Sequence, residues 1–76
     1  MEYYLVEIVK LNGLKNYYGK NYHEVFPKYG FLNMKDAEYA FETETDGAQN
    51  VLSYIERTKQ LGIRVDKCNV VKVKCI

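Results

Sequence analysis

The chain has 76 residues, of which 47% are hydrophobic and 28% charged, and its formal net charge is +1. A chain of this length forms one domain around one small core, so we expect residues 1–76 to make a single small α+β domain. The balanced charge argues against a uniformly basic nucleic-acid-binding protein, and no apolar run approaches the roughly 18 residues of a membrane span.

The charges are unevenly placed along the chain. Residues 36–56 hold six acidic residues and no basic one, whereas residues 57–76 hold six basic residues and one acidic one. This layout favours acids on one strand facing Lys72 and Lys74 on another. The first residues lack the basic start and apolar run of a secretion signal, which predicts a cytoplasmic protein.

The first predicted element is a strand over residues 2–11. Its side chains are apolar on both faces, with Glu7 as the exception, which is typical of a strand at the centre of a sheet. Asn12-Gly13 follows, a strong signal for a tight β-hairpin, and we expect a short return strand over 14–18.

Residues 19–36 are less regular. Pro27 excludes a central strand here, because proline cannot donate to a sheet ladder. We expect a short strand over 29–32 and a turn over 33–36. Residues 37–45 then alternate apolar and acidic side chains, which predicts a half-buried strand.

An amphipathic helix is predicted over 46–61. Wound at 100° per residue, it gathers its apolar side chains on one half of the cylinder. Asp46 is the expected N-terminal cap, and Gly62 is the expected left-handed residue after the helix.

A last strand is predicted over 68–76, after a connector at 63–67. The expected fold is therefore a mostly antiparallel sheet of three to five strands with one helix, 46–61, on one face, in the order β-β-β-α-β. If strands 37–45 and 68–76 are parallel, their crossover should be right-handed, and the first strand is expected to lie between them.

The chemical signals are sparse. His23 has no cluster of metal ligands or catalytic partners around it in the sequence, and the glycines form no phosphate-binding loop. Cys68 and Cys75 are about 23 Å apart if they share one strand, which is beyond the reach of a disulfide. We therefore expect no enzyme activity, no metal and no cofactor.

One segment resembles a known family. Pro27-Lys28-Tyr29-Gly30-Phe31-Leu32-Asn33-Met34 resembles the third-strand signature of the RNA-recognition motif: Tyr29, Gly30 and Phe31 match it, and Leu32 nearly does. The following Lys35-Asp36-Ala37 is similar to the entry into that family's second helix. The resemblance implies that Tyr29 and Phe31 stack on bases.

One helix leaves the second face of the sheet without a cover. The tyrosine- and lysine-rich segment 15–31 either covers this face or presents its rings to a partner, since tyrosine is favoured at protein interfaces. The candidate partner-binding residues are Lys15, Tyr17, Tyr18, Lys20, Tyr22, Lys28, Tyr29 and Phe31.

The expected function is that of a small interaction protein, an adaptor or inhibitor that contacts a macromolecule through its surface. Phage-encoded inhibitors of host enzymes or defence complexes are one such class. The alternative is a module that binds single-stranded RNA or DNA through Tyr29, Phe31 and nearby lysines. Homodimerisation through the uncovered face or an edge strand is compatible with the first reading, and a small ligand held between two subunits would leave no trace in the sequence.

Overall fold

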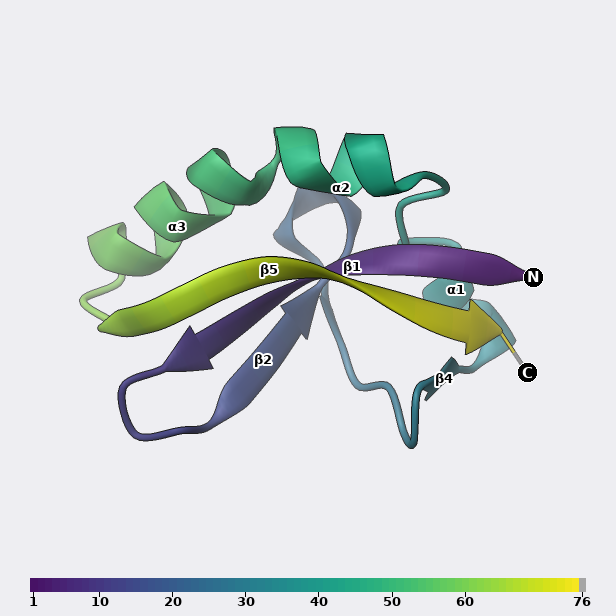
Figure 1. Ribbon diagram of the computed structural model, residues 1–76, viewed down its shortest axis with the longest axis horizontal. Helices are drawn as coiled ribbons and strands as arrows, with labels where there is room; N and C mark the ends of the chain where they lie inside the picture. The colour runs from purple at the N-terminus through teal and green to yellow at the C-terminus, as the bar shows by residue number, and fades with distance from the viewer. Residues whose placement is uncertain (76) are drawn as a thin grey trace.

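A five-stranded, mostly antiparallel sheet carries the fold in the computed structural model, which describes residues 1–75 (Figure 1). Its strand order is β3-β2-β1-β5-β4. The elements in chain order are β1 (Glu2–Lys10), β2 (Lys15–Tyr18), the 3-10 turn η1 (Lys20–Tyr22), β3 (Glu24–Val25), β4 (Phe31–Leu32), α1 (Met34–Ala37), α2 (Glu44–Gln49), α3 (Val51–Gln60) and β5 (Val65–Cys75). The predicted α+β class is confirmed. The predicted order β-β-β-α-β is wrong in one respect, because four strands and not three precede the helices.

Strand β1 lies at the centre of the sheet, as its two apolar faces predicted. It pairs antiparallel with β2 on one side and with β5 on the other. The hairpin to β2 is also confirmed: Gly13 has φ +85°, and the Lys10 amide donates to the Leu14 carbonyl at 2.9 Å. This left-handed backbone is the reason that glycine suits the turn.

The predicted strand over 37–45 is wrong. Asn33 caps α1 by accepting a 2.8 Å hydrogen bond from the Asp36 amide, so the predicted turn over 33–36 and the start of that strand are helical. The chain then meets the sheet at one residue, where Phe41 exchanges two backbone hydrogen bonds with Tyr4. Ala40 and Phe41 are both buried although they are neighbours, whereas the predicted half-buried strand would expose every second residue.

Without that strand, two further predictions are also wrong. β1 does not separate two parallel strands: β4 is the strand parallel to β5, and it lies directly beside it. The acids of 37–45 do not face Lys72 across a sheet, because this segment is not a strand. Lys72 instead forms an ion pair with Glu2 of β1, with 3.6 Å between Nζ and Oε2.

The predicted helix over 46–61 begins earlier and is broken. Thr43, not Asp46, is the N-cap, since its hydroxyl accepts from the Asp46 amide at 3.1 Å. Asn50 separates α2 from α3, with φ −100° and ψ −5°. Gly62 has φ +78°, so the predicted left-handed residue after the helix is confirmed.

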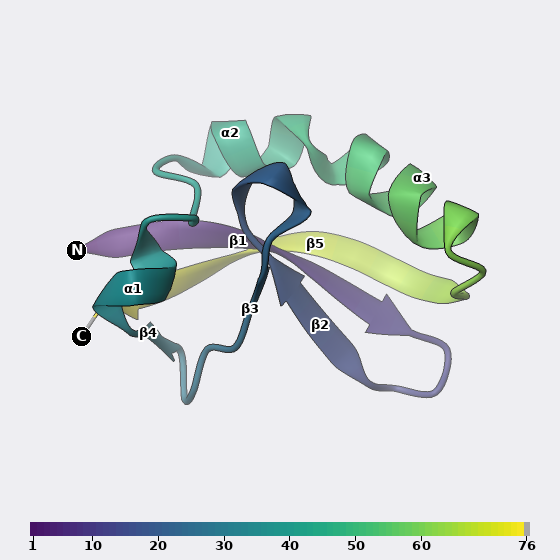
Figure 2. The same cartoon turned by 180° about the vertical axis from the view of Figure 1, so that it is seen from behind.

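Helices α2 and α3 cover one face of the sheet (Figures 1 and 2). On that face Val6, Ile8, Phe41 and Tyr54 form one buried cluster. On the opposite face Leu5, Val25, Leu32, Ala40 and Val73 form a second cluster. The second face is therefore covered near the chain ends by residues from 25–40. None of the helices within residues 1–75 has the length and apolar character needed to cross a membrane.

Strand β5 holds both Cys68 and Cys75, as predicted, and their seven-residue separation along one extended strand keeps the two thiols apart. Ile76, the last residue of the predicted strand, lies outside the described residues.

Candidate functional site

The segment 28–31 forms a tight hairpin at the edge of the sheet. Lys28 and Phe31 exchange two backbone hydrogen bonds of 2.9 Å each, and the two residues between them have positive φ, +53° for Tyr29 and +81° for Gly30. Two positive φ angles in a two-residue hairpin loop define a type I′ turn. Asparagine and glycine suit both positions of such a turn, whereas a tyrosine at the first position is strained.

Large apolar side chains are exposed within the hairpin and just before and after it. Tyr29 is 98% exposed, Met34 77%, Phe26 73% and Phe31 42%. We call these four residues the hairpin surface. Aromatic residues and methionine are enriched where proteins meet, whereas isolated exposed apolar residues are ordinary. The hairpin surface is unusual in bringing four such side chains onto nine residues of chain, and Tyr29 contributes nothing to the core.

The segment that resembles the RNA-recognition motif is this hairpin. Phe31 and Leu32 form β4, a two-residue strand at the edge of the sheet. Tyr29 lies in the turn before the strand, with its ring in solvent. The two aromatic residues that matched the motif are thus exposed, as base stacking would need, but the sheet itself carries Phe31 alone.

Two of the candidate tyrosines pack beneath helix α3. The rings of Tyr18 and Tyr22 lie 6.1 and 4.6 Å from the ring of Tyr54, and the Arg57 guanidinium lies 4.6 Å from the centre of the Tyr22 ring. The Tyr54 hydroxyl donates to the Gly19 carbonyl and accepts from the Tyr22 amide. Tyr18 and Tyr22 therefore act chiefly as a cover for the helix-side cluster.

Tyr17 and Lys15 lie on the opposite face of β2. Tyr17 is half-buried and packs against the cluster that contains Leu5 and Val25. Burial, followed by the neighbouring Glu7 carboxylate, raises the pKa of the Tyr17 phenol. The eight candidate residues thus form no single surface: Lys28, Tyr29 and Phe31 come together, whereas Tyr17 is on one face and Tyr18 and Tyr22 on the other.

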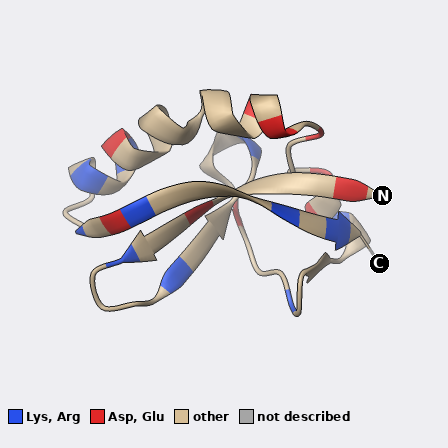
Figure 3. Ribbon diagram, viewed as in Figure 1, with Lys and Arg blue, Asp and Glu red and all other residues tan. Residues whose placement is uncertain are grey.

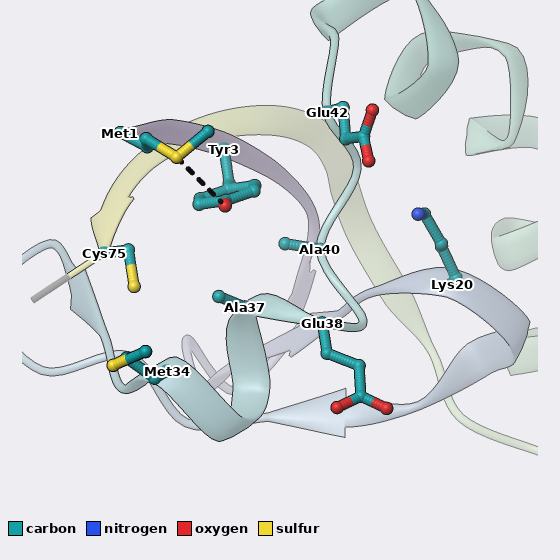
Figure 4. A pocket seen from close by; sticks show the side chains of 9 residues that line it. All are labelled: Met1, Tyr3, Lys20, Met34, Ala37, Glu38, Ala40, Glu42 and Cys75. Carbon is teal, nitrogen blue, oxygen red and sulfur yellow. Dashed lines mark hydrogen bonds between the residues drawn. The ribbon is translucent and has the colours of Figure 1, made fainter.

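Lys20, the remaining candidate, lines a cavity of about 580 Å³ near the chain ends (Figure 4). Met1, Tyr3, Met34 and Cys75 gather on one side of this cavity, and Lys20 and Glu42 stand on the other. Its volume is in the range of small-molecule sites. Met34 belongs to both the cavity and the hairpin surface, so the two features border each other.

Residues 1–75 offer little for catalysis or metal binding. No three His, Cys, Asp or Glu side chains in this part of the chain come together as a metal site requires. His23 stacks on Tyr39, with 3.8 Å between ring centres and 13° between ring planes. Burial, followed by Glu7, raises the pKa of the Cys68 thiol, which disfavours the nucleophilic thiolate.

The sequence signal for the hairpin surface was partial. The sequence predicts Tyr29 and Phe31 as site residues through their resemblance to a motif, but it does not predict Phe26 or Met34. The available signal is the concentration of large apolar residues around Pro27: Phe26 precedes it, and Tyr29, Phe31 and Met34 follow it. Comparisons with protein-family models, with curated proteins and with solved structures find no match to this chain.

Proposed function

We propose that this chain is a small non-enzymatic interaction protein that binds a protein partner through the hairpin surface, Phe26, Tyr29, Phe31 and Met34. The observation that carries the proposal is the state of Tyr29. Its ring is 98% exposed, and its backbone has φ +53°.

Neither folding nor packing favours a tyrosine at this position. A left-handed conformation costs a residue with a Cβ atom roughly 1–2 kcal/mol, and the exposed ring gains no buried contact in return. Asparagine would satisfy the same turn with less strain. Strain that persists without a structural benefit is a reason to look for a contact with another molecule.

The chemistry of the hairpin surface suits a protein partner. Tyr and Phe supply large contact areas with two rotatable side-chain angles, so ordering them costs little entropy. Flanking Lys28 adds a charge at the rim, where electrostatics affect mainly the rate of association. An adaptor or inhibitor in the cytoplasm needs no more than such a surface, and we place the chain in that class.

A capture experiment tests the proposal. Tagged protein is incubated with lysate of its native host, and the captured proteins are compared between the wild type, Tyr29→Asn and Leu52→Asn. Leu52 is 76% exposed on α3, away from the hairpin, and so provides the matched control. We expect Tyr29→Asn to lose the captured partner and Leu52→Asn to retain it. Equal capture by both variants would overturn the proposal.

Binding of single-stranded nucleic acid is the second candidate. The exposed rings of Tyr29 and Phe31 beside Lys28 favour it, since base–aromatic stacking and backbone charge are the usual elements of such sites. Nuclease treatment of the lysate and a salt titration with mixed RNA and single-stranded DNA separate it from the leading proposal. Binding through phosphates weakens steeply with salt, and absence of binding at low salt dismisses this candidate.

A further inference from the structure

The outer edge of β5 is open over most of its length. β5 has 11 residues and pairs with β1 from Val65 to Lys74. On its other side, within residues 1–75, β4 pairs with Lys74 and Cys75 alone. The burial agrees with this geometry. Leu5 and Val6 of β1 are 0% exposed, whereas their partners in β5, Val71 and Val70, are half-buried.

The register shows which backbone groups point outward. Tyr4 directs both its amide and its carbonyl to Phe41, away from β5, and its partner in β5 is Lys72. In an antiparallel ladder, such a non-bonded pair turns the backbone groups of both residues away from each other. Lys72 therefore points its N–H and C=O to the open edge. Backbone groups alternate in direction along a strand, so those of Val70 and Cys68 point to the same edge.

The junction with β4 agrees with this assignment. Lys74, two positions further on, donates its amide outward to the Gly30 carbonyl at 2.9 Å. At the other end, the register shifts between Val9 and Lys10, which marks a bulge at Asp66. The open and regular part of the edge is thus 67–72, bounded by the bulge and by the hairpin.

A hollow of about 200 Å³ joins this edge to the hairpin. It is lined by Tyr17, Val71, Val73, Tyr29 and Gly30, among others. Side chains of a strand point alternately to the two faces of a sheet. A strand added beside β5 would therefore place a side chain against this hollow while it reaches the Tyr29 ring at the hairpin tip.

The charge at the edge is mainly basic. Lys67, Lys72 and Lys74 lie on β5 and Lys28 on the adjoining hairpin (Figure 3). Of these four, one is in an ion pair within residues 1–75: Lys72, whose partner Glu2 is half-exposed. Two copies of this chain paired edge to edge would bring the lysines of both β5 strands together, whereas an acidic strand would neutralise them.

We infer that the partner protein adds an extended, acidic segment to the sheet as a strand along residues 67–72 of β5. Unpaired strand edges accept such strands because backbone hydrogen bonds supply affinity and the flanking side chains supply specificity. This inference rests on the proposed function and deepens it: the hairpin surface holds the partner at one end of the strand, and the edge of β5 selects its charge.

Hydrogen exchange of the ¹⁵N-labelled chain tests the inference. The probes are eight-residue peptides that alternate valine or tyrosine with glutamate, and the control peptides carry lysine in place of glutamate. We expect the glutamate peptides to slow exchange of the Cys68, Val70 and Lys72 amides by about tenfold or more, as new hydrogen bonds would. Equal effects of the lysine peptides, or no protection of these three amides, would overturn the inference.

A backbone variant makes the test sharper. Ligation at Cys68 allows residues 68–76 to be made synthetically with Nα-methyl-lysine at position 72. The methyl group on the backbone nitrogen removes one outward N–H and keeps the lysine side chain. Lys72→Thr is the matched control, because it removes the charge and keeps the N–H. We expect N-methylation to weaken peptide binding by about tenfold and Lys72→Thr to weaken it less. The amide of Val6 in the central strand reports whether both variants are folded.

The remaining outcomes separate this inference from the proposed function. If Tyr29→Asn loses the captured partner and N-methylation at position 72 does not, the hairpin proposal stands and strand addition is wrong. If N-methylation abolishes peptide binding and Tyr29→Asn captures the partner normally, strand addition stands and the hairpin proposal is wrong. If raising the protein concentration slows exchange of the same amides without any peptide, two copies of this chain pair at this edge. That result would overturn the inference of an acidic partner segment.

Discussion

The hydroxyl of Tyr54 donates a hydrogen bond to the backbone carbonyl of Gly19, 35 residues away in the sequence. The same oxygen accepts from the Tyr22 amide at 3.3 Å. Asn21 and Tyr22 both have positive φ, +55° and +58°, which is unfavourable for residues with side chains. One side chain of helix α3 thus holds both ends of a strained turn against the sheet.

We predict that Tyr54→Phe destabilises the fold by about 1–3 kcal/mol. The substitution keeps the buried ring and its contacts but leaves the Gly19 carbonyl without its donor. Chemical denaturation measures the loss. Tyr3→Phe is the control: its hydroxyl donates to the sulfur of Met1 at 3.7 Å in an exposed position, so its removal should change stability by less than about 0.5 kcal/mol.

Tyr29→Asn is predicted to stabilise the fold by roughly 0.5–1 kcal/mol. Asparagine tolerates the left-handed conformation better than tyrosine, and the exposed ring has no buried contact to lose. Phe26→Asn removes a similarly exposed ring without that backbone gain, and should have little effect. A drop in the midpoint of thermal unfolding for Tyr29→Asn would contradict the strain assigned to this turn.

Gly19→Ala should cost about 1–3 kcal/mol or more. A Cβ atom at this position would lie 2.2 Å from the backbone oxygen of Tyr39, so the loop or the 38–41 segment must move. Gly47→Ala is the contrasting variant. Its Cβ would meet a γ-methyl group of Val70 at 3.0 Å, and this β-branched side chain has little freedom to move, but alanine improves helix propensity. We therefore expect a smaller loss of stability than for Gly19→Ala. Paired denaturation curves compare them.

The stability of the fold is predicted to fall in alkaline solution. Burial raises the pKa of the Cys68 thiol above 9.0, with Glu7 adding to the effect, and burial is also the main cause of the raised pKa of the Tyr54 phenol above 10.0. The folded state thus holds these protons more tightly than the unfolded state. The stabilising effect is complete below the unfolded pKa values and is lost as pH rises through them towards the folded values.

Denaturation at a series of pH values checks this dependence. Cys68→Ala should remove the part of the decline that begins near pH 9.0, and Tyr54→Phe the part that begins near 10.0. A Cys68→Ala variant with an unchanged alkaline profile would contradict the assignment. Slow reaction of Cys68 with a thiol reagent at neutral pH is the companion expectation, since the thiolate is the reactive form.

The elements that the sequence predicted well are those defined by local chemistry. The double-sided apolar pattern of 2–11 and the Asn12-Gly13 turn predicted β1 and its hairpin. The prediction of a strand over 37–45 is wrong although the alternation is present in the sequence. Its first residue, Ala37, belongs to helix α1, which Asn33 caps. Asn33 and Thr43 each precede an acidic residue by three positions, which is a helix-start signal, and both side chains do cap helices.

The candidate site was harder to predict because its parts depend on tertiary packing. Tyr22 and Tyr29 look alike in the sequence, yet one lies under Arg57 and Tyr54 and the other in solvent. Nothing in the dipeptide Tyr29-Gly30 predicts a type I′ turn, for which asparagine or aspartate is the usual first residue. The extent of the open edge of β5 could not be predicted, because tertiary packing sets how much of β5 the two-residue strand β4 pairs with.

The pairing of β1 with β5 has a consequence for folding in the cell. Glu2 lies opposite Lys74, and the Cys75 amide donates to the Met1 carbonyl, so β1, the first strand of this sheet in chain order, pairs with β5, the last. Contacts this distant in sequence close large loops and form slowly. During synthesis, the hairpin of β1 and β2 can form before β5, the second partner of β1, has been made. Its apolar faces then stay available to chaperones until β5 arrives, so this fold is completed after translation of its final strand.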